Sequence, residues 1–159
     1  MSNKLDETLA GVAEDTIMSL AFLFLMSEDE AGGIEADASV TASVEFSGPF
    51  AGALFLPAPQ PMLDELAANM LGFEQGEAGL PSDDVKNDAL KELLNVICGN
   101  LLPEIAGNEA VFKVHAPQIQ PESAIPETYR DQHQAGAAKF YVEEGALELV
   151  VFVDNHALV

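Results

Sequence analysis

At 159 residues the chain is long enough to bury one hydrophobic core, so we expect a single domain over residues 1–159. It has 27 acidic and 6 basic residues, a formal net charge of -21, so phosphate backbones and anionic membrane surfaces are repelled and nucleic acid is not an expected partner. The acidity is equally consistent with a salt-adapted or acidic host proteome and with a basic protein partner.

The N-terminal segment predicts one long helix. Apolar residues recur at a helical period from Lys4 to Met26, and the last turns are apolar nearly all round. The first turns are acidic and lack the basic region of a secretory signal. The longest apolar run, from Leu20 to Met26, is far below the roughly 20 residues that span a bilayer. We therefore expect a cytoplasmic protein with no membrane contact.

A hairpin and a short helix are expected next. Residues 38–46 alternate apolar and polar side chains, which predicts a half-buried strand. Residues 51–57 are more continuously apolar, which favours a second strand deeper in the sheet. Residues 62–72 predict a short helix with Gly72 as its C-cap, followed by a loop.

A second long helix begins near Asp83 or Asp84, either of which would serve as its N-cap, and runs to about Leu102, with a further turn possible before Gly107. A strand at 110–117, a long polar loop at 118–134 and a C-terminal hairpin turning near residues 144–145 complete the chain. This order predicts an α+β fold with a mainly antiparallel sheet packed against long helices.

The second long helix carries a narrow polar stripe. Asp88, Glu92 and Asn95 are four and then three residues apart, so they lie within roughly 60° of one another around the helix, and Gly99 continues the line. The opposite side of the helix is apolar and consists of Leu90, Leu93, Leu94, Ile97 and Leu101.

Taken on spacing alone, such a stripe is most often a solvent-facing surface. A metal site is poorly supported, because the stripe offers few ligands and the histidines have no ligand-like spacing to it: His115, His133 and His156. Nucleophilic catalysis lacks a recognisable motif, and the only cysteine, Cys98, lies on the apolar helix, where we expect it to be a small buried side chain.

Asp88, Glu92 and Asn95, followed by Gly99-Asn100 and by Pro117 22 residues after Asn95, resemble the signature of the CheC/CheX/FliY family of chemotaxis phosphatases. The expected order of helices and strands is also similar to that family. Members of the CheC branch carry a second motif on the first helix. Here Glu14 is followed by Ile17 at the position that would require asparagine, so the chain resembles CheX most and we expect a single site.

The resemblance implies a CheC-like fold and hydrolysis of the aspartyl phosphate on a CheY-like response regulator. In this interpretation Asn95 holds the attacking water and Glu92 pairs with a basic group of the receiver. Asp88, Gly99 and Asn100 would contribute to docking.

The resemblance further implies a homodimer paired through its sheet. It implies no cofactor or metal bound by this chain, since the phosphorylated receiver supplies magnesium. The alternative function is a non-catalytic acidic docking module of the flagellar-switch or signalling apparatus, because an acidic domain could bind basic partners without hydrolysing anything.

Overall fold

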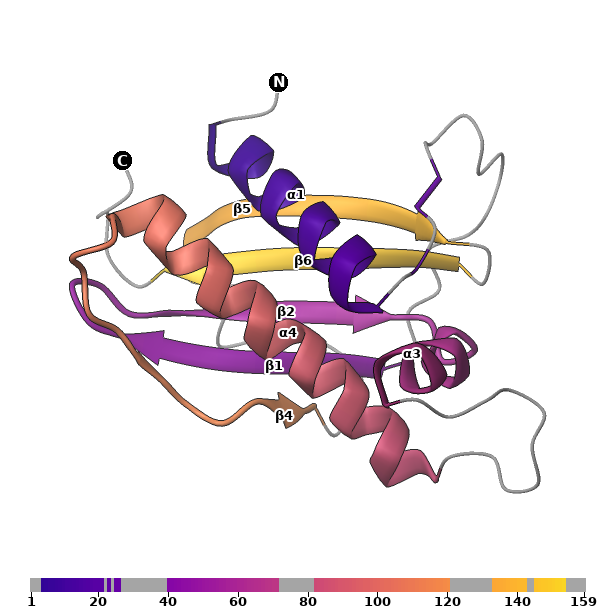
Figure 1. Ribbon diagram of the computed structural model, residues 1–159. Coiled ribbons are helices and arrows are strands. Elements are labelled where there is room, and N and C mark those ends of the chain that lie inside the picture. Colours follow the sequence, from indigo (N-terminus) through magenta and orange to yellow (C-terminus); the bar gives the residue numbers. More distant parts are fainter. Residues whose placement is uncertain are drawn as a thin grey trace.

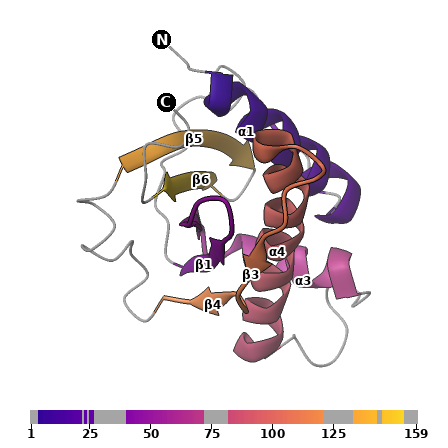
Figure 2. The ribbon, with the colours of Figure 1, turned by 90° about the vertical axis from the view of Figure 1, so that its left-hand side faces the viewer.

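A computed structural model describes residues 4–21, 23, 25–26, 40–71, 82–120, 133–142 and 145–153. Its described helices all lie on one face of an antiparallel sheet, so the fold has two layers (Figure 1). The view from the side shows the helices stacked against the sheet, with α4 crossing it (Figure 2). Most of the hydrophobic core lies between these two layers.

Within these residues the sheet has six strands, and all of their pairings are antiparallel. They are β1 (Val40–Ser47), β2 (Gly52–Ala58), β3 (Lys113–Val114), β4 (Gln118–Ile119), β5 (His133–Val142) and β6 (Gly145–Val153). The spatial order is β3-β1-β2-β6-β5, with β4 also pairing with β1. The predicted α+β fold and both hairpins are therefore confirmed.

Strand β2 is central, as its continuous apolar sequence predicts. Leu54 and Leu56 face the helices. Ala53 and Phe55 belong to a second, smaller cluster, together with Val150 and Phe152 of β6. Both faces of β2 are thus covered, which explains why its residues do not alternate in polarity.

The prediction that β1 is half-buried is wrong for its first half. Thr41 and Ser43 are buried, and only Glu45 of the expected polar face is exposed. The segment that includes β4 contributes to this burial. It runs along β1, where the Gln120 amide donates to the Thr41 carbonyl (2.8 Å) and Gln120 Nε2 donates to Ser43 Oγ (2.5 Å). Nothing in the β1 sequence itself indicates this cover.

The first helix is shorter than predicted. Helix α1 (Lys4–Thr16) continues into a π-helical turn, Ile17–Ala21, and ends there. Met26, the expected last helical residue, instead forms an isolated bridge to β5, with its amide donating to the Tyr141 carbonyl (2.8 Å). A run that is apolar on every side carries no period, so it could not distinguish these two conformations.

The other helices are α3 (Met62–Leu71) and α4 (Asp83–Ala106). The expected cap of α3, Gly72, lies outside the described residues. The N-cap of α4 is Ser82, because its Oγ accepts from the Val85 amide (3.3 Å), so the prediction of Asp83 or Asp84 is wrong. Both aspartates lie in the first turn, where carboxylates stabilise the positive end of the helix.

At its C-terminus, α4 includes the additional turn and ends before Gly107. That glycine has φ 90°, and its amide donates to the Pro103 carbonyl (2.8 Å). A positive φ is readily adopted only by glycine, which accounts for the stop.

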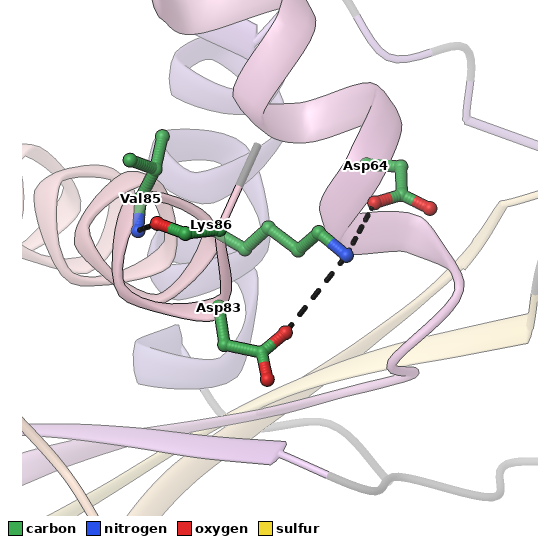
Figure 3. A network of polar contacts seen from close by, with 5 residues as sticks. Asp64, Asp83, Val85 and Lys86 are labelled. Atoms are coloured by element: carbon green, nitrogen blue, oxygen red, sulfur yellow. Dashed lines mark hydrogen bonds and ion pairs between the residues drawn. The ribbon is translucent and has the colours of Figure 1, made fainter. Parts of the chain in front are cut away.

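An ion pair joins α3 to the first turn of α4 (Figure 3). Lys86 Nζ lies 2.7 Å from Asp64 Oδ1 and 4.0 Å from Asp83 Oδ1. The hydrogen bond with Asp64 raises the pKa of Lys86, so its ammonium stays charged at physiological pH. This pair connects the first turn of α4 to α3, and apolar residues of both helices belong to the main core.

The region after α4 differs most from the prediction. The expected strand at 110–117 is reduced to Lys113–Val114. The expected loop at 118–134 is wrong at both ends, because Gln118–Ile119 form β4 and β5 begins at His133. Residues 121–132 lie outside the described part of the chain.

Candidate functional site

Helix α4 is held rigidly by its apolar side. Leu90, Leu93, Leu94, Ile97 and Leu101 are all 0% exposed and belong to the main core. The helix is 24 residues long, its buried residues run from Ala89 to Leu102, and it crosses the helical layer (Figure 1). Side chains on the opposite face of α4 are therefore presented from a fixed backbone.

The predicted polar stripe lies on that outer face. Asp88, Glu92 and Gly99 are exposed, and Asn95 is half-buried between them. With a rise of about 1.5 Å per residue, the Glu92 and Asn95 backbones are separated by about 4.5 Å along the helix axis. Both side chains can thus reach into the same small site on another molecule.

The two central residues of the stripe have no partner within the described part of the chain. Asp88 differs, because its Oδ1 lies 3.1 Å from Lys91 Nζ. Neither the Glu92 carboxylate nor the Asn95 carboxamide makes a hydrogen bond or ion pair among the residues that the structure describes. Their hydrogen-bonding groups are available to an external partner.

Asn100 is turned toward α1. Its Nδ2 donates to Thr16 Oγ1 (3.2 Å), and the Thr16 hydroxyl donates to the Val12 carbonyl (2.8 Å). Thr16 is only 4% exposed, so this relay lies at the interface of α1 and α4. Sequence reasoning did not single out Thr16, because the contact depends on how two helices 84 residues apart pack together.

Pro117, the remaining residue of the signature, is half-buried between β3 and β4 and so shapes the chain beside β1. The stripe residues therefore lie on α4, in the helical layer, whereas Pro117 lies at the edge of the sheet. The stripe is the part of the signature that faces outward along α4.

A second site on α1 is absent from the described structure. Glu14 is exposed, but Ile17 is 0% exposed and part of the core. A side chain at position 17 points into the protein and could not act together with Glu14 on another molecule. The inference of a single site therefore has a geometric basis as well as the missing asparagine.

The described residues offer little for other kinds of chemistry. Among them no group of three or more His, Cys, Asp or Glu side chains is placed to hold a metal ion. Burial raises the pKa of the Cys98 thiol to about 12, so it is not a thiolate nucleophile at neutral pH. None of the described helices is both long and apolar enough to cross a membrane.

Comparison with known families decides the relationship. The model of the chemotaxis phosphatase CheX family matches residues 40–140, well over half of the chain, and this range contains the whole stripe. The chain belongs to the CheX family. No curated protein matches the sequence.

Solved structures show that the whole CheX fold is retained. The chemotaxis protein CheX from Vibrio vulnificus superposes with a TM-score of 0.70 at 14% identity, covering 95% of this chain and 97% of that one. CheX from Desulfovibrio desulfuricans gives 0.65 at 14% identity, with 95% and 99% covered. A CheX-CheY-BeF3-Mg complex from Borrelia burgdorferi also gives 0.65 at 14% identity, with 94% and 97% covered.

Proposed function

We propose that this CheX-family protein hydrolyses the aspartyl phosphate of a CheY-like response regulator and so terminates a chemotaxis or two-component signal. The observation that carries the proposal is the outward pair of Glu92 and Asn95, unpartnered within the described chain, on the anchored helix of a chemotaxis phosphatase family member.

The chemistry requires little from the phosphatase. Water attacks the phosphorus atom, the bond between phosphorus and the aspartyl oxygen breaks, and the products are a carboxylate and inorganic phosphate. An acyl phosphate is already activated, so catalysis consists mainly of positioning the water in line with the breaking bond. The Asn95 carboxamide can both donate to and accept from that water.

The receiver provides the charge compensation. The solved complex of a related CheX contains CheY, beryllium fluoride and magnesium, which supports a phosphorylated receiver as the partner and as the source of the metal. Asp88 and Gly99 border the catalytic pair and are assigned to docking. We further propose that the protein acts as a single domain, as a homodimer and in the cytoplasm.

Glu92 is assigned to recognition of a basic group near the receiver's phosphoryl site. Replacing it with alanine is expected to raise the dissociation constant for a receiver carrying a phosphoryl mimic by about tenfold, because a charge-assisted hydrogen bond is lost. Isothermal titration calorimetry would measure this. Glu104→Ala is the matched control, since it removes another exposed charge roughly 120° around the same helix.

The docking assignment of Glu92 would be wrong if Glu92→Ala and Glu104→Ala bound alike, or if the affinity of the unmodified protein did not fall with added salt.

The proposal as a whole is tested by phosphate release from a phosphorylated CheY-like receiver. A phosphatase must increase the rate above the receiver's own hydrolysis at substoichiometric concentration. A docking module would bind the receiver and leave that rate unchanged, which would favour the alternative function.

A further inference from the structure

Gly99 lies in the interior of α4 without any internal need for glycine. It is exposed and does not adopt a positive φ, which within the described residues is found at Gly107 and Gly145. A Cβ built at position 99 would meet no atom within 4 Å. Glycine in a helix interior is less favourable than alanine, so α4 is less stable here than it could be.

Pro103 distinguishes this glycine from other exposed ones. It lies inside α4, four residues after Gly99, and has no amide hydrogen. The Gly99 carbonyl therefore lacks the donor that an α-helix normally provides from four residues further on. Both residues are exposed, so this part of the helix backbone lies on the solvent-facing side of α4.

Gly99 also lies on the same line as the catalytic pair. It is four residues after Asn95, about 6 Å further along the helix axis and about 40° further around it. Gly99 is therefore one of the positions of α4 that lie nearest to a receiver whose phosphoryl group reaches Asn95.

We propose that Gly99 is the point of closest approach between α4 and the receiver. There, a backbone N–H bordering the receiver's phosphoryl site donates to the Gly99 carbonyl, and the missing Cβ lets the two main chains meet. This inference rests on the proposed function and adds a recognition contact to it. It explains why a glycine and a proline are both tolerated within an otherwise well-anchored helix.

The test compares Gly99→Ala, Pro103→Ala and the control Gly11→Ala in the full chain. Gly11 is exposed inside α1 and also has open space at its Cβ, but residue 15, four positions on, is an aspartate that has an amide hydrogen. Both glycine replacements should raise the melting temperature by about 2–4 °C, since alanine is the better helix former.

Binding separates the variants. Gly99→Ala should raise the dissociation constant for the receiver with a phosphoryl mimic by about tenfold, whereas Gly11→Ala should leave it unchanged. Pro103→Ala supplies the missing amide donor within the helix. It should therefore weaken binding by about threefold while also raising the melting temperature.

The close approach would be overturned if an active Gly99→Ala protein had a dissociation constant within twofold of that of the unmodified chain. The carbonyl contact would be overturned if Pro103→Ala left the dissociation constant unchanged. If the unmodified protein itself released no phosphate from any receiver, the proposed function would fail and this inference with it. These results are distinguishable because the first two require an active parent protein.

Discussion

Asn95→Ala is expected to lower the rate of receiver dephosphorylation by about a hundredfold, the scale on which one positioned polar group contributes in a reacting site. The change removes the carboxamide that holds the attacking water. The fold should persist, because Asn95 is half-buried at the outer face of α4 and alanine is a good helix former. Phosphate release at saturating phosphorylated receiver measures the loss, and circular dichroism verifies the fold.

A matched variant separates catalysis from any general effect of losing a carboxamide on α4. Asn87→Ala makes the same chemical change on the same helix, roughly 80° around from Asn95, and should retain the parental rate. A folded Asn95→Ala protein with unchanged turnover would eliminate the role assigned to this residue.

Removal of magnesium is expected to lower the rate of receiver dephosphorylation at least as much as Asn95→Ala does. With excess chelator, catalysed phosphate release should fall to the background, since the receiver's divalent ion offsets charge on the phosphoryl group in the transition state. Adding magnesium back should restore the full rate. The phosphatase itself should purify without stoichiometric metal, which elemental analysis of the isolated chain would measure.

A metal bound tightly by the phosphatase itself would require a different mechanism. Zinc, manganese or iron that remains bound through purification, and whose removal abolishes activity while magnesium does not restore it, would identify a metallohydrolase. The water would then be activated by the metal and not positioned by Asn95.

Elements with a clear period were predicted well, and elements defined by distant contacts were not. The C-terminal hairpin and α4 follow directly from their patterns of apolar residues. Thr41 and Ser43 are polar residues in a strand and were predicted to face solvent, yet both are buried, and Ser43 is contacted by the segment around β4, more than 70 residues later. The prediction of where α1 ends was wrong for another reason, since the segment is apolar on nearly all sides and shows no clear period.

Most of the candidate site could be predicted from the sequence, because its residues lie on one helix. Spacing along α4 alone places Glu92 and Asn95 on a common face. What spacing cannot reveal is which polar groups are already engaged. Asp88 pairs with Lys91, and Asn100 is bonded to Thr16 across the helix interface. Asn100 therefore has a structural contact in addition to the docking role that the resemblance implies.

The long outer strand of the sheet has consequences for association between chains. Strand β5 is at the edge, but two of its backbone groups are already used: the Ala137 amide donates to Asp6 Oδ1 (2.8 Å), and the Tyr141 carbonyl accepts from Met26 (2.8 Å). A strand from another chain, including the partner subunit of the proposed homodimer, would have to displace both contacts before it could pair along the whole of β5. Among the residues that the structure describes, the opposite edge consists of the two-residue strands β3 and β4. Edge-to-edge growth into larger aggregates is thereby disfavoured by the same residues that attach α1 and Met26 to the sheet.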